Sequence, residues 1–311
     1  MSKAPSLMSV RGAEARGAIA PGDNREGSLV MPGVLTGFGI APGLLALAVQ
    51  GVPGVRVRWS SGSEPHSPEG LSRIAQRAYT FAGGSPEHAA DLRVDCDGPG
   101  GGAGRGLGWA AGSALGGARL AGATSEALLR AAGRALQEHA GHPRSHAICA
   151  LAQGGLHAMR NAWPPASTRL VWPTALHIGV VIPGWQGRED LRRYLPQSVS
   201  LRRAAAHMGE LLATWEAAQS GDIERFAQGL VDPWTEEHLL RRIPGALPAA
   251  AQARAAGALH VGLSSRGPSV VVLAAGADTL AEAMESACRT WAAHSIPTQS
   301  YAVSAVTEGA A

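Results

Sequence analysis

The sequence has 311 residues, of which 45% are apolar and 16% charged, with a formal charge of +3 and a sequence pI near 9.0. This apolar content suffices for a full hydrophobic core, and no run reaches the roughly eighteen apolar residues that a membrane-spanning helix needs. Only one of the 27 basic residues is a lysine, Lys3, which excludes mechanisms that need a buried lysine, such as Walker-type phosphate binding or Schiff-base chemistry.

The N-terminal segment and the cysteines both bear on the compartment. Residues 1–27 mix charged and small side chains without the apolar region of a signal peptide, so we expect a flexible leader and a cytoplasmic protein. The three cysteines, Cys96, Cys149 and Cys288, lie far apart and have no C-x-x-C spacing. We interpret them as buried thiols in a reducing compartment, with a nucleophilic role for Cys149 as the alternative.

Apolar periodicity predicts strands and a helix in the first hundred residues. A short apolar stretch at 28–34 precedes a segment rich in glycine and proline, residues 36–43. A capping signal followed by helical spacing predicts a helix from Ser67 to Ala82. Short apolar runs or strict alternation of apolar and polar residues predict strands at residues 44–49, 55–59 and 91–95.

The densest glycine run, residues 98–108, lies between the strand at 91–95 and an alanine-rich helix predicted at 110–120. A glycine loop that leads from a strand into a helix presents unpaired backbone N–H groups and the helix dipole to an anion. The sequence therefore indicates a phosphate site at this loop. The alternative is a tight crossing from strand to helix that binds no ligand.

The rest of the chain continues the mixture of helices and strands. Helices are predicted at 124–140, 223–230 and 279–294, with two more inside 190–218 that are broken near Pro196. Strands are predicted at 176–182 and 299–306, and a hairpin is predicted from 258–263 and 269–273 across the turn at 264–268. Because the elements do not alternate strictly, we predict the α+β class rather than a doubly wound parallel sheet.

The order of these motifs resembles that of the GHMP small-molecule kinases, and the second half is most similar to the homoserine kinases. The matching stretches of the second half are residues 193–201, 207–209, 221–222, 242–245 and 257–268. The likeness extends over about residues 30 to 305. It implies a two-lobe α+β fold, with an N-terminal lobe at 28–175 that carries the glycine-rich loop and a C-terminal lobe at 176–311.

In the GHMP family, ATP lies along a loop of the pattern P-x-x-x-G-L-G-S-S, so the resemblance implies ATP and magnesium as cofactors. The loop matches at 104–108, but Trp109 and Ala110 replace the two serines, whose hydroxyls meet phosphate and magnesium. An indole offers one N–H donor and no metal ligand. The cofactor-binding residues expected from the resemblance are Gly104, Arg105, Gly106, Leu107, Gly108, Trp109, Ala110 and Ala111.

The substrate side departs further from the family pattern. Thr36 and the Gly37-Phe38-Gly39 stretch stand where the family has an asparagine and G-F-D. Arg144 and Ser145 replace the last two residues of the family's G-H-P-D-N motif. The expected substrate-binding residues are Thr36, Phe38, Arg144, Ser145, Arg188, Arg192, Ser264, Ser265 and Arg266.

Three residues are candidates for a catalytic role. His146 follows the altered acid and amide positions, and an imidazole serves as a general base near neutral pH. Arg192 falls where the family places an arginine on the substrate carboxylate. Arg266 lies in the third motif, where a small residue is usual, and a guanidinium there grips a phosphate or carboxylate through two parallel hydrogen bonds.

Three functions stay open at this point. The first is ATP-dependent phosphoryl transfer to the hydroxyl of a small amino-acid-like substrate. The second keeps the scaffold for another group transfer, such as an acyl or aminoacyl transfer to a hydroxyl or hydroxylamine acceptor. An aminoacyl-tRNA donor would engage the arginines and loop tryptophans. The third is a non-catalytic ligand-binding relative. The resemblance also implies a homodimer, and we expect no membrane partner and no zinc site.

Overall fold

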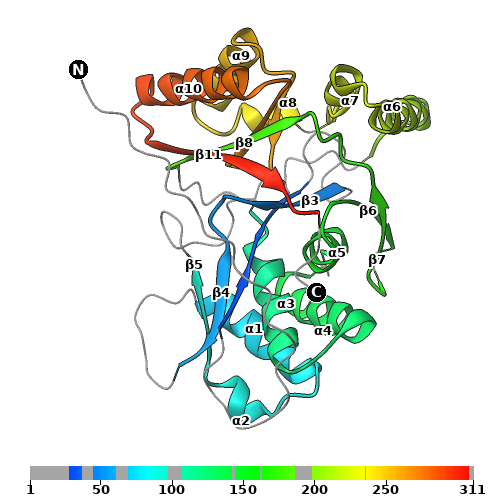
Figure 1. The fold of residues 1–311 in the computed structure, drawn as a ribbon, viewed down its shortest axis with the longest axis vertical. Helices are drawn as coiled ribbons and strands as arrows, with labels where there is room; N and C mark the ends of the chain where they lie inside the picture. Colours follow the sequence, from blue (N-terminus) through cyan, green and yellow to red (C-terminus); the bar gives the residue numbers. More distant parts are fainter. Residues whose placement is uncertain are drawn as a thin grey trace.

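A computed structural model describes residues 28–36, 45–60, 69–96, 107–141, 144–161, 163–185, 198–234, 236–265 and 267–307 of the chain. Within these residues the protein has two antiparallel sheets with helices packed against them (Figure 1), which confirms the predicted α+β class. The predicted leader, residues 1–27, and the segment around Pro196 lie outside the described residues. None of the described helices combines the length and hydropathy needed to cross a membrane.

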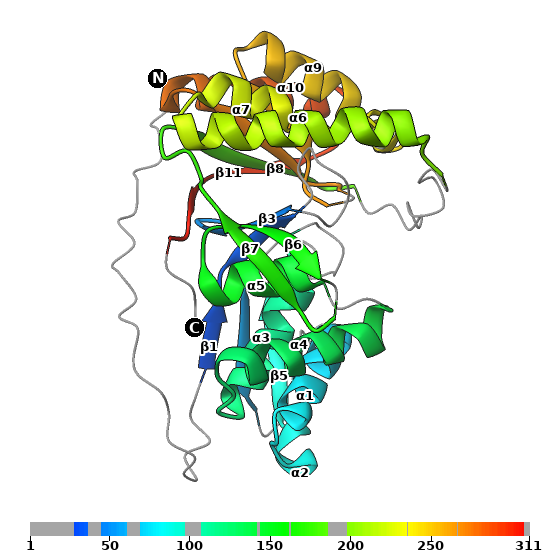
Figure 2. The ribbon, with the colours of Figure 1, turned by 90° about the vertical axis from the view of Figure 1, so that its right-hand side faces the viewer.

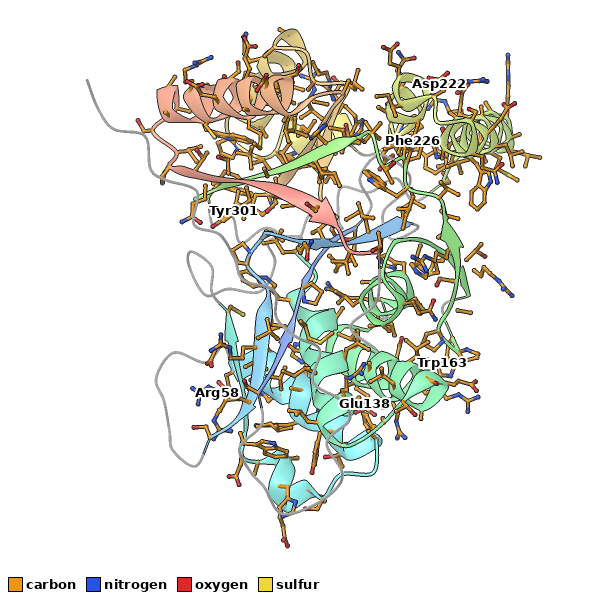
Figure 3. All side chains as sticks on the ribbon, viewed as in Figure 1. Arg58, Glu138, Trp163, Asp222, Phe226 and Tyr301 are labelled. Atoms are coloured by element: carbon orange, nitrogen blue, oxygen red, sulfur yellow. The ribbon has the colours of Figure 1, made fainter. Side chains whose placement is uncertain are left out.

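The smaller sheet has three strands in the order β1 (Ser28–Met31), β4 (Val55–Trp59) and β5 (Leu92–Cys96). The helices beside it are α1 (Glu69–Phe81), α2 (Pro86–Ala89), α3 (Trp109–Leu120) and α4 (Ser125–Ala140). Val55 and Val57 of β4 are buried towards α3, where two glycines of the helix leave room for their side chains. Arg58 of the same strand, labelled in Figure 3, is half-buried and pairs with Asp95 at 2.6 Å. This alternation confirms the half-exposed strand predicted at 55–59.

The larger sheet follows the order β7-β6-β3-β11-β8-β10-β9, with β2 also paired to β3. Its strands are β2 (Gly33–Thr36), β3 (Leu45–Gln50), β6 (Leu156–Asn161), β7 (Ala166–Leu170), β8 (His177–Pro183), β9 (His260–Leu263), β10 (Val270–Ala274) and β11 (Thr298–Ala305). Strand β11, red in Figure 1, pairs with β8 along most of its length and with β3 at its end. One continuous sheet therefore includes strands from both halves of the chain.

The remaining helices are α5 (Ser145–Gln153), α6 (Leu201–Ser220), α7 (Ile223–Gly229), α8 (Glu236–Leu240), α9 (Ala246–Ala255) and α10 (Ala277–Ala293). Helices α9 and α10 enclose a second core with one face of β8, β10 and β9, and Trp291 of α10 is fully buried there. Figure 2 shows α6 lying along the outside of the upper part beside α7. Phe226 of α7, labelled in Figure 3, packs edge-on against Trp172 with ring centroids 5.6 Å apart.

Most predicted elements are present with small differences in their ends, and the predicted hairpin is confirmed by the antiparallel pairing of β9 with β10. Helices α2, α5, α8 and α9 and the strand pair β6 and β7 were not predicted from the sequence. In α5 every residue except the last is buried, so the helix lacks the polar face that makes a helical period visible. Of the two helices predicted within 190–218, the second corresponds to α6.

Candidate functional site

Strand β2 joins the end of the glycine loop to the turn after β9. The Val34 N–H donates to the Leu107 carbonyl at 3.1 Å. Two residues later, the Thr36 N–H donates to Ser264 Oγ at 3.3 Å, and the Thr36 carbonyl accepts a hydrogen bond from the Ser265 N–H. Thr36 and Ser264 are 228 positions apart in the sequence. Three predicted substrate-binding residues, Thr36, Ser264 and Ser265, are therefore in direct contact.

Gly108, the N-cap residue of α3, lies in close contact with β2. Gly108 has a φ of 70°, and a Cβ at this position would lie 1.8 Å from Val34 Cγ1, so only glycine fits without displacement. The helical ladder starts with the bond from the Gly112 N–H to the Gly108 carbonyl. The N–H groups of the first turn, those of Trp109 to Ala111, precede this ladder, and Gly108 has no side chain to cap them. Such donors at the positive end of a helix dipole suit the oxygens of a phosphate.

Trp109 does not offer its indole to this helix end. The side chain is buried, and its Nε1–H donates to the Pro53 carbonyl at 3.0 Å. The one N–H donor of the indole is thus already engaged within the chain. The next hydroxyl of the helix, on Ser113, is fully buried and donates to the Trp109 carbonyl at 2.8 Å. Among the groups that the structure describes here, the backbone N–H groups of the first turn remain for an anion.

Helix α5 carries three further predicted residues at its start. Arg144 is its N-cap residue with a φ of 49°, Ser145 is fully buried, and His146 is 8% exposed. The helix that these residues begin packs against β2 and β3. Arg144 and Ser265 are two of the four non-glycine residues with positive φ among the described positions. Strained backbone of this kind concentrates at functional sites.

The charge of Arg144 reaches the end of the neighbouring helix α4. Burial lowers the pKa of His139, and the positive charges of Arg73, Arg77 and Arg144 lower it further. A cationic imidazole is disfavoured beside these three arginines, so His139 stays neutral near neutral pH. The region around the start of α5 thus gains its positive charge from guanidinium groups.

Sequence reasoning missed a pair of buried ionisable side chains beside the turn after β9. A Cβ on Gly262 would lie 2.5 Å from His260 Nε2 and 2.8 Å from Glu236 Oε2, so the glycine gives both groups room to meet over the strand. Glu236 lies at the start of α8 and is 7% exposed, while His260 is 3% exposed. No hydrogen-bond partner for His260 Nε2 exists among the described residues.

Burial keeps both members of this pair uncharged near neutral pH. It raises the pKa of Glu236 to about 8, although Arg254, whose Nη2 is 3.7 Å from Glu236 Oε1, opposes the shift. Burial lowers the pKa of His260 to about 3, and the charge of Arg254 acts in the same direction. Alternate residues of a strand share a face, so His260, Gly262 and Ser264 line one side of β9 and its turn.

Seven predicted site residues lie outside the described part of the chain: Phe38, Gly104, Arg105, Gly106, Arg188, Arg192 and Arg266. Within the described part, no group of three or more His, Cys, Asp or Glu side chains is arranged to hold a metal ion. Cys149 is buried as expected, whereas Cys96 and Cys288 are only half-buried. Burial raises the pKa of the Cys149 thiol, which disfavours the thiolate that a nucleophile needs and so argues against the alternative.

Comparison with known proteins gives likenesses of sequence and of fold. The chain is 31% identical over 222 residues to the homoserine kinase of Moorella thermoacetica, an alignment that covers 69% of this chain and 72% of that protein. The crystal structure of homoserine kinase from Cytophaga hutchinsonii superposes with a TM-score of 0.78 at 19% identity, over 94% of this chain and 99% of that one.

A second solved structure extends the likeness of fold. The L. major mevalonate kinase, crystallised with R-mevalonate, superposes with a TM-score of 0.60 at 17% identity, over 90% of this chain and 96% of that chain. No protein-family model matches the chain. The likeness of fold therefore extends over almost the whole chain, and the likeness of sequence over about two thirds of it.

Proposed function

The chain belongs to the GHMP kinase superfamily, close to the homoserine kinases, and on that premise we propose that it transfers the γ-phosphoryl group of ATP to the hydroxyl of a small amino-acid-like substrate. The observation that carries the proposal is the junction at β2, where the start of α3 and the turn after β9 meet through Val34 and Thr36. Because homoserine is the substrate named for the relatives, it is the first compound to test.

The phosphates of ATP would bind at the start of α3. The uncapped N–H groups of the first turn and the left-handed Gly108 fit this role, because they present donors without a competing side chain. Gly104, Arg105 and Gly106 would complete the phosphate loop. Magnesium would be held mainly by phosphate oxygens and water, as is usual for this ion, since Trp109 and Ala110 supply no ligand.

On the substrate side, the reaction joins the hydroxyl oxygen to the γ-phosphorus and breaks the bond between that phosphorus and the oxygen of ADP. We assign His146 as the acceptor of the hydroxyl proton, supported by its position at the start of α5 beside β2. Thr36, Ser264 and Ser265 would line the substrate, together with Phe38, Arg144 and Arg188. Arg192 and Arg266 would hold the substrate carboxylate and the transferred phosphate.

Nucleotide binding tests the phosphate site directly. Calorimetric titration with ATP and magnesium should detect binding, and a coupled assay should detect ADP release that depends on homoserine or a similar hydroxylated amino acid. Ala110→Asp should abolish nucleotide binding while the helix stays intact, because a carboxylate in the first turn favours the helix but repels phosphate. Ala110→Asn, the neutral variant of the same shape, should retain binding. Wild-type protein that binds no nucleotide at millimolar concentration would contradict the proposal.

The role of His146 has its own test. His146→Gln should lower kcat by about 10²-fold or more while the affinity for ATP stays the same, because only proton transfer is removed. The pH dependence of kcat should lose its acidic limb in this variant. An unchanged kcat would assign the proton to another acceptor and would leave the phosphate site unaffected.

One observation favours the second candidate function, a different group transfer on the same scaffold. The loop residues that would serve magnesium are replaced, and the indole of Trp109 is turned to Pro53. An acyl or aminoacyl transfer needs no such ligand. If the protein binds no nucleotide but binds RNA in a filter assay, with affinity that falls as salt rises, then aminoacyl transfer replaces the kinase proposal. The third possibility, a non-catalytic relative, predicts binding of small ligands in the calorimetric titration and no turnover in the coupled assay.

A further inference from the structure

Helix α6 carries the most exposed large apolar side chains of the described residues. Leu201 is 85% exposed, Leu212 is 73% exposed and Met208 is 64% exposed. Isolated exposed apolar residues are ordinary, but three on one helix form a patch that calls for a partner. Helix α7 is the described element on which α6 mainly packs, and Figure 2 shows α6 along the outside of the molecule.

These side chains form one continuous stripe along α6. Steps of four, three and four residues lead from Leu201 through Ala205 and Met208 to Leu212, and another three lead to the half-buried Trp215. This is the spacing of the a and d positions of a coiled coil, which keeps one seam on one side of a helix. The residues that α6 buries within its own chain, His207, Thr214, Ala217 and Ala218, lie on another side. The stripe is thus not the face that packs on α7.

The charged side chains beside the stripe would pair with those of a second, antiparallel α6. Arg202 and Glu216 are fourteen positions apart, so they lie on the same flank of the stripe near its two ends. Both are exposed, and among the described residues Glu216 makes a single ion-pair contact, at 3.7 Å from Arg225. In an antiparallel pair of α6 helices, Arg202 of one copy lies beside Glu216 of the other, and the two-fold axis repeats the contact.

The middle of the same flank allows the two helices to approach. Gly209 lies halfway between Arg202 and Glu216, and a Cβ at this position would meet nothing within 4 Å. The antiparallel register that pairs the charges also sets Met208 beside Leu212 of the second copy, and Ala205 beside its Trp215. Small residues near the crossing point bring helix axes closer, because the distance between them depends on the side chains in contact.

We propose that α6 is a self-association surface, on which a second copy of this chain packs its own α6 in antiparallel orientation about a two-fold axis. We assign a second copy as the partner because an antiparallel pair of α6 helices sets apolar residues against apolar residues along the whole stripe. The same arrangement places Arg202 of each copy beside Glu216 of the other. A helix of 20 residues is about 30 Å long, so this contact is smaller than a standard interface, and we expect micromolar affinity.

Sedimentation equilibrium of the full chain from about 1 to 100 μM tests the proposal. The wild-type protein should dimerise in this range. Leu212→Asp should leave only monomer, because it buries a carboxylate in the centre of the seam. Its helix content, followed by circular dichroism, should be unchanged since Leu212 is exposed. A wild-type chain that is monomeric at 100 μM would overturn the proposal, whatever else the stripe binds.

Charge reversal identifies the orientation. Arg202→Glu and Glu216→Arg should each weaken dimerisation by roughly tenfold or more, because two ion pairs per dimer become repulsive. The double variant should return to near the wild-type affinity. Arg203→Glu is the matched control, since its side chain lies on the opposite side of α6 and should leave the affinity unchanged. A double variant as weak as the singles, or a dimer that Leu212→Asp leaves intact, would overturn the antiparallel contact.

Discussion

On the α3 side of Thr36, close apolar packing adds to one backbone hydrogen bond from Val34, whereas on the β9 side the contacts of Thr36 are hydrogen bonds to Ser264 and Ser265. Gly108 touches Val34 and Trp109 is buried against the segment after β3, with no ionisable side chain in these contacts. The turn after β9 bonds to Thr36 through Ser264, and His260 of the strand lies near Glu236 of α8. The free energy of unfolding should therefore depend on side-chain volume on the α3 side and on pH on the β9 side.

The largest effect is expected from adding volume on the α3 side. Gly108→Ala combines a Cβ only 1.8 Å from Val34 Cγ1 with a left-handed backbone, so it should lower the free energy of unfolding by about 4 kcal/mol. Urea unfolding followed by circular dichroism measures this change.

Gly122→Ala is the matched control at the other end of α3. Gly122 also has a positive φ, of 83°, but a Cβ there would meet nothing within 4 Å. Its cost should be about 1 kcal/mol, the conformational part alone. If the two variants lose the same stability, close packing on Val34 does not hold the start of α3.

A second, intermediate effect concerns pH on the β9 side. The folded pKa of Glu236, about 8, lies above its ordinary value of 4.5, so the folded state holds a proton that the unfolded state has lost. Stability should therefore fall as pH rises towards 8. At about 1.4 kcal/mol per pH unit, the loss between pH 6.5 and 8 is about 2 kcal/mol.

The histidines act in the opposite direction and at lower pH. The pKa of His260 is lowered from 6.5 to about 3, so its contribution to stability is lost as pH falls below 6.5. Burial also lowers the pKa of His157 and His207, which adds to the same acid-side loss. Because histidines of the unfolded chain still bind protons at pH 6.5, the difference between the wild type and a Glu236 variant is what isolates Glu236.

Denaturant unfolding at pH 6.5 and pH 8 separates the two neighbouring glutamates. Glu236→Gln should abolish the loss of stability between these pH values, because the amide carries no proton to lose. Glu237→Gln should preserve it, since Glu237 is exposed and pairs with Arg241 on the surface. If the wild type and Glu236→Gln change in stability by the same amount between these pH values, Glu236 is ionised in the folded protein.

The smallest expected losses of stability come from removing one buried hydroxyl on the β9 side and one on the α3 side. Ser264→Ala removes the acceptor of the Thr36 N–H and should cost about 1.5 kcal/mol, because a buried donor is left unpaired. Ser113→Ala removes a buried donor to the Trp109 carbonyl, which also serves the helix ladder, and should cost about 0.5 kcal/mol. Thermal unfolding measures both, and a reversed order would mean that the bond to Thr36 contributes little to holding the turn.

Periodicity was a good guide where an element has one polar face. The alternation in β4 and the spacing in α1 predicted those elements because Arg56 and Arg73 mark the exposed side. The same reasoning fails for α5, which presents only its last residue to solvent. A helix enclosed on all sides shows no period, so its sequence resembles any short apolar run.

The candidate site shows a similar limit. The contact of Thr36 with Ser264 and Ser265 follows from the order of motifs, because the resemblance brings those motifs together. Glu236 could not be distinguished from Glu237 in the sequence, since burial of one and exposure of the other arise only when α8 packs beside β9. The direction of the Trp109 indole was equally hidden, because it depends on where the Pro53 carbonyl lies.

Strand β11 has a consequence for the order of assembly. It comes after every other described strand along the chain, yet it lies in the middle of the larger sheet, between β3 and β8. During synthesis, β2, β3, β6 and β7 leave the ribosome early, but they have no edge in common with β8 to β10 until residues 298–305 emerge. The larger sheet therefore becomes continuous only when β11 joins the two groups of strands, so its completion depends on contacts that are distant in sequence.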